Sequence, residues 1–135
     1  MVIVDTSVWV SHLRYGNAEL VNLLNDNQVM CHPFIIGEIA CGNIRNRAEI
    51  LALLGSLPMS LQAKHEEVLE FIERNKLMGL GLGYVDMHLS ASAALSGVPI
   101  WTLDVKLDKT NRKMGISYRG SLKTPANFEF AIEVL

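Results

Sequence analysis

The chain has 135 residues, of which 50% are hydrophobic and 19% are charged, and its formal net charge is −2. This length and composition suit a single compact core and exclude an intrinsically disordered chain. The slightly acidic balance argues against a protein that holds nucleic acid by overall positive charge alone.

The cysteines and the N-terminus bear on the cellular compartment. Cys31 and Cys41 form neither a CxxC pair nor the framework of a secreted disulfide-rich domain, which predicts reduced thiols. Residues 1–5 lack the basic start of a signal peptide. The longest stretch without Asp, Glu, Lys or Arg, residues 87–103, contains serines and a Gly-Val-Pro break, which a membrane span would tolerate poorly. We therefore expect a soluble, cytoplasmic protein.

Strand and helix patterns alternate along the chain. Apolar, β-branched runs predict buried strands of a parallel sheet, and amphipathic or small-residue runs predict helices. The expected strands are residues 1–4, 28–32, 99–103 and 116–118. The expected helices begin after Asp5-Thr6-Ser7 and then cover residues 18–25, 34–41, 47–54, 63–78, 84–96 and 104–114. This order predicts an α/β fold with a central parallel sheet and helices on both faces, in a single domain spanning residues 1–135.

The helix expected at residues 63–78 has the clearest amphipathic pattern. We expect its inward face to carry Val68, Leu69, Ile72 and Leu77, and its outward face to carry glutamates.

Four carboxylates fall near the carboxyl ends of the predicted strands, where α/β sheets bind ligands. They are Asp5, Glu38, Asp86 and Asp104. Carboxylates that converge without Lys or Arg repel one another unless a cation lies among them. Ligation by oxygen alone favours Mg²⁺ or Mn²⁺, which can support metal-assisted hydrolysis of a phosphodiester.

Each acid also has a structural alternative. Asp5 and Asp104 could cap helices, Asp86 could favour the first turn of a helix, and Glu38 could lie on a solvated helix face. The hydroxyls of Ser7 and Thr102 could orient water or a substrate phosphate, or could serve only local structure. Asp108 lies four residues after Asp104 and could share its face as an outer ligand or be a surface acid.

Other signals are weaker. The glycine-rich residues 79–83 follow a helix and lack the Lys-Ser/Thr of a phosphate-binding loop, which favours a flexible connector. The four histidines show no zinc spacing. Basic residues gather after Asp104 and resemble a patch for a phosphate backbone, or a solvated helix face. The candidates for RNA binding are Lys106, Lys109, Arg112 and Lys113.

The placed acids and their neighbours resemble a PIN-domain ribonuclease of the VapC toxin type. The resemblance rests on Val2-Ile3-Val4-Asp5-Thr6-Ser7, on residues 33–40 with Glu38, on residues 83–93 with Asp86, and on Trp101-Thr102-Leu103-Asp104. It extends from the first residue to about Ser117, and the tail at residues 119–135 lies outside the shared motifs.

The resemblance implies an α/β/α sandwich, with Mg²⁺ or Mn²⁺ held by Asp5, Glu38, Asp86 and Asp104. It implies endonucleolytic cleavage of RNA, with a 3′-hydroxyl and a 5′-phosphate as products, and a tRNA or the large ribosomal RNA as the target. It also implies a homodimer and a cognate antitoxin that inserts a segment into the acidic groove.

Three other interpretations compete with this one. A phosphoacceptor receiver domain needs an aspartate after a middle strand, but none occurs between Asp26 and Asp86. A phosphatase of the haloacid dehalogenase type needs a second aspartate where Ser7 stands. The remaining rival keeps the PIN fold but binds RNA or protein without cutting.

Overall fold

The computed structural model describes residues 1–120 of the chain, and a three-stranded parallel sheet lies at its centre. The strands are β1 (Val2–Val4), β2 (Val29–Met30) and β3 (Ile100–Trp101), in the order β2-β1-β3. Ile3 is paired with Met30 on one side and with Ile100 on the other. All three residues of β1 are buried, as its unbroken apolar sequence predicts for a central strand.

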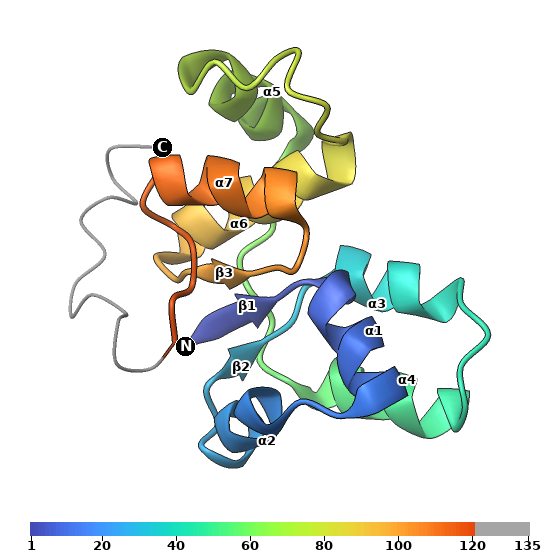
Figure 1. Ribbon diagram of the computed structural model, residues 1–135. Helices are drawn as coiled ribbons and strands as arrows, with labels where there is room; N and C mark the ends of the chain where they lie inside the picture. Colours follow the sequence, from blue (N-terminus) through green and yellow to red (C-terminus); the bar gives the residue numbers. More distant parts are fainter. Residues whose placement is uncertain (121–135) are drawn as a thin grey trace.

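Seven helices surround this sheet within the described residues. Their bounds are α1 Thr6–Tyr15, α2 Ala18–Asn25, α3 Pro33–Ala40, α4 Arg47–Ser56, α5 His65–Arg74, α6 Tyr84–Ser96 and α7 Val105–Lys113. In Figure 1 the helices α1 to α4 occupy the lower half of the molecule, and α5 to α7 occupy the upper half. The mixed α/β class and the parallel sheet are thus as the sequence predicts.

The outer strands are shorter than expected. β2 and β3 contain two residues each, where runs of five were predicted. Single parallel bridges extend the sheet beyond them, from Cys31 to Met59 and from Ile100 to Ser117. The segment at residues 116–118 therefore joins the sheet through one bridge and is not a full strand. A run of apolar residues predicts that a segment is buried, but it does not determine how many of its residues pair with a neighbouring strand.

The helix α5 differs from the expectation at its end and on one face. It ends at Arg74, because Lys76 adopts a left-handed backbone with φ of 55° and the Leu77 N–H returns to the Ile72 carbonyl at 2.9 Å. The assignment of Leu69 to the inward face is wrong, since this side chain is 49% exposed. Phe71 takes the inward place and is buried. The two residues are two positions apart and point to different sides of the helix, so Phe71 faces the core where Leu69 does not.

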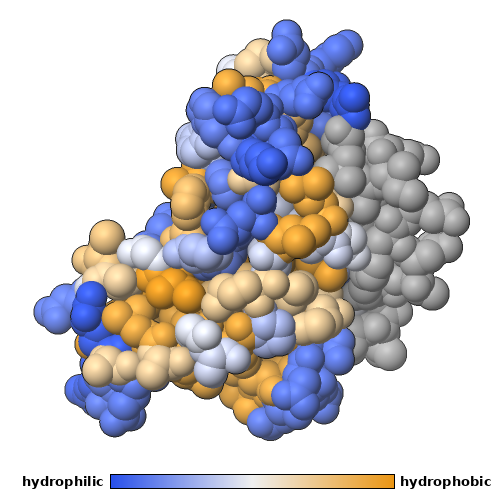
Figure 2. Space-filling model, turned by 180° about the vertical axis from the view of Figure 1, so that it is seen from behind, coloured by the Kyte–Doolittle hydropathy of each residue, from blue (hydrophilic) through white to orange (hydrophobic). Residues whose placement is uncertain are grey.

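Hydrophilic and hydrophobic residues are unevenly distributed over the surface of the described part of the chain. Figure 2 shows a hydrophilic upper part over the Glu-rich α5 and apolar areas in the lower half. No helix among residues 1–120 combines the length and the apolar character that crossing a bilayer requires.

Candidate functional site

Two neighbouring strands are each followed by an aspartate, and both aspartates lie at the same edge of the sheet. Asp5 follows β1 and is the N-cap of α1, and Asp104 follows β3 and is the N-cap of α7. The Asp104 Oδ1 accepts the Leu107 N–H at 2.9 Å, whereas the Ser7 N–H is 3.4 Å from Asp5 Oδ2. The capping alternative is therefore confirmed for both aspartates, and capping occupies only one oxygen of each.

Asp5 is held by two hydroxyl groups. Its side chain is only 6% exposed, and its Oδ2 accepts the protons of Ser7 Oγ and Thr102 Oγ1, each at 2.8 Å. The two hydroxyls are themselves fixed by the turn after β3, where the Leu103 N–H donates to Ser7 at 2.9 Å and the Asp104 N–H donates to Thr102 at 3.1 Å. Ser7 and Thr102 thus orient the Asp5 carboxylate. A role in orienting water or phosphate stays a prediction.

Asp86 lies in the first turn of α6, where the negative charges of Asp5 and Asp104 act on its carboxylate. Its Oδ2 accepts the Gly83 N–H at 3.3 Å. Burial raises the pKa of Asp86, the hydrogen bond from Gly83 lowers it, and the negative charges of Asp5 and Asp104 raise it further, with a net upward shift. Burial is the largest of these causes, and the repulsion adds to it, as expected of acids gathered without a cation.

Glu38 reaches the same edge through a residue that the sequence analysis did not single out as functional. The Thr6 hydroxyl donates to Glu38 Oε1 at 2.8 Å and joins the start of α1 to α3. Glu38 is exposed, as on a solvated helix face, yet this bond directs it toward the residue that follows Asp5. The position of Thr6 directly after an acid at a strand end was the signal that could have identified it.

The four acids share one pattern, and together we call them the acidic edge (Asp5, Glu38, Asp86 and Asp104). In each, one oxygen accepts a hydrogen bond from a hydroxyl or a backbone N–H, and the other has no donor within residues 1–120. No Lys or Arg of that part of the chain pairs with them. As they stand, no three His, Cys, Asp or Glu side chains of these residues are close enough together to hold a metal ion. The carboxylates are therefore gathered and oriented, but they do not form a closed coordination shell.

Asp108 differs from this pattern, and the difference separates it from the acidic edge. Its Oδ1 accepts the Ser117 hydroxyl at 2.6 Å, and its Oδ2 pairs with Arg112 Nε at 2.8 Å. Both oxygens are thus engaged with neighbouring side chains, and its charge is offset by a guanidinium. Asp108 is a structural acid of α7 and of the chain that follows it.

Buried polar contacts hold α6 in the position that presents Asp86. Ser92 accepts the Ala63 N–H at 3.0 Å and lies 3.2 Å from His32 Nε2, which connects α6 to the start of α3. On the other side, the Ser90 hydroxyl donates to the fully buried Asn111 of α7 at 2.8 Å. Because buried hydrogen bonds are costly to break, these contacts fix the helix that carries one acid against the helix capped by another.

The predicted basic residues of α7 do not share one environment. Arg112 is paired with Asp108, whereas Lys106, Lys109 and Lys113 are exposed and form no ion pair within residues 1–120. The glycine-rich link lies beside this helix, with Lys106 Nζ against Gly81.

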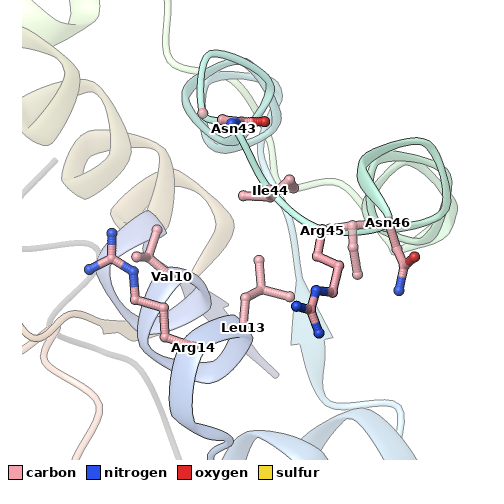
Figure 3. Close-up of a pocket in the computed structure, with 9 residues that line it drawn as sticks. Val10, Leu13, Arg14, Asn43, Ile44, Arg45 and Asn46 are labelled. Atoms are coloured by element: carbon pink, nitrogen blue, oxygen red, sulfur yellow. The ribbon is translucent and has the colours of Figure 1, made fainter.

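A separate hollow of about 400 Å³ lies between α1 and the segment that joins α3 to α4. Figure 3 shows Val10, Leu13 and Ile44 around it, together with the guanidinium groups of Arg14 and Arg45. No Asp or Glu of the described part of the chain lines this hollow, so it is not part of the acidic edge.

Comparison with known proteins agrees with this arrangement. The PIN domain profile matches residues 2–113. Over 118 residues the chain is 43% identical to Ribonuclease VapC32 of Mycobacterium tuberculosis, in strain CDC 1551 / Oshkosh and in strain ATCC 25618 / H37Rv. Each alignment covers 87% of this chain and 95% of the relative.

The chain belongs to the PIN-domain family, among the VapC-type ribonucleases. The acidic edge lies within the matched PIN domain, as do Ser7 and Thr102. The similarity of sequence therefore extends over the whole region in which the structure gathers the carboxylates.

Proposed function

We propose that the protein is an endoribonuclease toxin of a toxin–antitoxin pair, and that the acidic edge is its metal-dependent active centre. The observation that carries this proposal is the shared state of the four carboxylates. Each is anchored through one oxygen, leaves the other without a donor, and has no cationic partner in residues 1–120. A group of acids with this arrangement is suited to bind a cation.

The donor set fits Mg²⁺ or Mn²⁺. Carboxylate oxygens are the ligands that such hard cations prefer. Burial is the largest cause of the raised pKa of Asp86, and the charges of Asp5 and Asp104 add a repulsion that a cation would offset. Asp5, Glu38, Asp86 and Asp104 would hold the ion. When bound, it would supply activation of water and stabilisation of the leaving oxygen of a phosphodiester.

The residues of the chain itself contribute orientation. Ser7 and Thr102 hold the Asp5 carboxylate in one rotamer, and Thr6 does the same for Glu38. Such support matters because a ligand that rotates freely loses affinity and geometric precision. The acidic edge also repels the RNA backbone, so substrate binding requires the cation and positive charge nearby.

The test is cleavage of RNA by the purified protein, followed by mapping of the ends. We expect internal cuts with a 3′-hydroxyl and a 5′-phosphate, and no cuts with Asp5→Asn. The matched control is Asp108→Asn, which removes one carboxylate outside the acidic edge. Equal cleavage by wild type and Asp5→Asn would overturn the proposal, and RNA binding without cleavage by the wild type would favour a non-catalytic PIN module.

The remaining parts of the proposal concern partners. We expect a homodimer in the cytoplasm, a cognate antitoxin that inserts a segment into the acidic groove, and a tRNA or the large ribosomal RNA as substrate. Sequencing of RNA ends after induction in cells identifies the substrate, and size-exclusion chromatography with light scattering measures the oligomeric state.

A further inference from the structure

A groove of about 360 Å³ separates α7 from the turn that follows α5. The α5 side contributes Asn75, Lys76, Leu77 and Leu80, and α7 and its C-cap contribute Thr110, Lys113 and Met114. The segment between α5 and α6 therefore lies against α7. The groove therefore has a partly apolar wall and two lysines from distant parts of the sequence.

A third lysine extends this charge toward the acidic edge. Lys106 lies seven residues before Lys113, about 10 Å along the axis of α7, and therefore on the same side of the helix. Its ammonium group lies against the link after the groove, where a Cβ added to Gly81 would be 3.2 Å from Nζ. Lys106 lies in the first turn of α7, which Asp104 caps, so the line of lysines reaches the end of the helix that carries one acid of the acidic edge.

The charges of this line are not balanced by the protein. Lys76, Lys106 and Lys113 are all exposed, and none forms an ion pair within residues 1–120. Among residues 1–120, no Asp or Glu lines the groove. Two of these positive charges lie in the wall of the groove and the third lies beyond its end. Together they attract a chain of negative charges, and 10 Å corresponds to about three nucleotides of a stacked strand.

The backbone of Lys76 gives an independent observation. It is a left-handed residue at the end of α5, a position that glycine or asparagine adopts at less cost. The other left-handed residues apart from glycines, among those described, are Asn27 and Asn46. Lysine has no conformational advantage at this place, and unfavourable backbone conformations concentrate at functional sites.

We infer that this lysine groove, defined by Lys76 and Lys113 in its wall and by Lys106 beyond its end, binds the phosphodiester backbone of the RNA substrate beside the cleaved bond. The inference rests on the proposed function and adds a substrate-binding site to it. Lys76 is new to the site, because it lies about 30 residues before the basic segment noted in the sequence. The leucines and Met114 offer apolar surface to riboses and bases that flank the phosphates.

The experiment measures RNA binding apart from cleavage. A fluorescein-labelled single-stranded RNA of about 20 mixed nucleotides is titrated with full-length protein carrying Asp5→Asn, over a range of KCl concentrations with Mg²⁺ present. For single-stranded RNA each lost phosphate contact lowers the slope of log K against log salt by about 0.7. The triple variant Lys76→Gln, Lys106→Gln, Lys113→Gln is expected to lower the slope by about 2, and each single change to weaken binding about two- to fivefold.

Two further variants separate recognition from general charge and from folding. Arg74→Gln removes one charge beside Lys76, from an exposed residue that does not line the groove, and is expected to leave the slope unchanged. Lys76→Gly is expected to raise the melting temperature, because glycine suits the left-handed backbone, and still to weaken RNA binding.

An unchanged slope in the triple variant, or an equal loss in Arg74→Gln, would overturn the inference. If the otherwise wild-type enzyme still cuts RNA with unaltered KM when it carries the triple change, the groove is wrong and the proposed function stands. If RNA binds through the lysines but the wild type cuts nothing, the groove stands and the proposed function is wrong.

Discussion

Asp104 of the acidic edge and Lys106 of the lysine groove both lie at the start of α7, yet the two regions are built in opposite ways. Each carboxylate of the acidic edge has one oxygen fixed by a hydrogen bond from a nearby residue or a neighbouring helix. The lysines of the groove have no such bonds within residues 1–120 and extend from exposed positions. Fixed ligands suit chemistry that needs exact placement, and exposed lysines suit a flexible, charged strand.

From this contrast we expect the acidic edge to determine kcat and the lysine groove to determine the affinity for RNA. The largest effect is expected from Asp86→Asn, which should lower kcat for RNA cleavage by at least about 1,000-fold. The metal-free variant should remain folded, because the change removes a carboxylate whose pKa is raised by burial and by two like charges. Single-turnover cleavage and a thermal melt measure the two quantities.

Asp108→Asn is the matched control for this prediction, since both oxygens of Asp108 are engaged with Ser117 and Arg112 away from the acidic edge. It should cut RNA at close to the wild-type rate. A large loss of stability in metal-free Asp86→Asn would mean that this acid is structural. It would contradict the assignment of turnover to the acidic edge.

The hydroxyls that orient Asp5 should have the next largest effect. Thr102→Val removes the donor to Asp5 Oδ2 and the acceptor of the Asp104 N–H, and should lower kcat about 10- to 100-fold. Thr102→Ser keeps the hydroxyl and should restore most of the rate. Steady-state kinetics with a fixed RNA and metal concentration measures this, and equal rates for the Val and Ser variants would contradict the positioning role.

A loss of stability at acid pH is expected from His32, which belongs to neither region. This residue is fully buried, its Nδ1 accepts the Phe34 N–H at 3.0 Å, and burial together with the nearby His88 lowers its pKa from 6.5 to about 4. Between these two values the unfolded chain binds the proton and the folded chain does not, so stability falls as the pH falls.

For this one group the loss from about pH 7 to about pH 5 is about 2 kcal/mol. Thermal melts across this range measure it for the wild type and for His32→Gln, whose pH dependence should be weaker. An equal dependence of stability on pH in both proteins would show that another group causes the loss of stability at acid pH.

The smallest effect is expected in the groove, from a change that leaves every lysine in place. Gly81→Ala puts a methyl group against Lys106 Nζ and should raise KM about twofold by displacing the ammonium group. Gly79→Ala is the control, because both glycines have a left-handed backbone, with φ of 75° and 74°, but nothing lies within 4 Å of the added methyl group at Gly79. Kinetics at low and at saturating RNA separate KM from kcat, and identical values for the two variants would show that Lys106 is not held by Gly81.

The sequence predicted the acidic edge better than the lysine groove, and the reason is physical. Asp5 and Asp104 directly follow strands, so the parallel sheet brings them together whatever the details of packing. Lys76 approaches α7 only because α5 stops early in a left-handed turn, which an amphipathic pattern running through residues 63–78 does not indicate. Likewise, the choice of Phe71 over Leu69 for the core depends on how α5 rotates against α6.

Hydrogen bonds across the fold were equally beyond prediction from local sequence. The bonds of Thr102 to Asp5 and of Thr6 to Glu38 join residues 97 and 32 positions apart. The residue types can be read from the sequence. The acceptor to which each hydroxyl donates, however, depends on the turn after β3 and on the packing of α1 against α3. The tail at residues 121–135 lies outside the described residues.

The most direct test of the acidic edge is metal removal and restoration with the wild-type protein and an RNA substrate. The protein is treated with EDTA, dialysed, and assayed alone, with Mg²⁺ and with Mn²⁺. The account predicts no cleavage without metal, recovery with either ion, and no recovery in Asp5→Asn. Full cleavage in EDTA would contradict it.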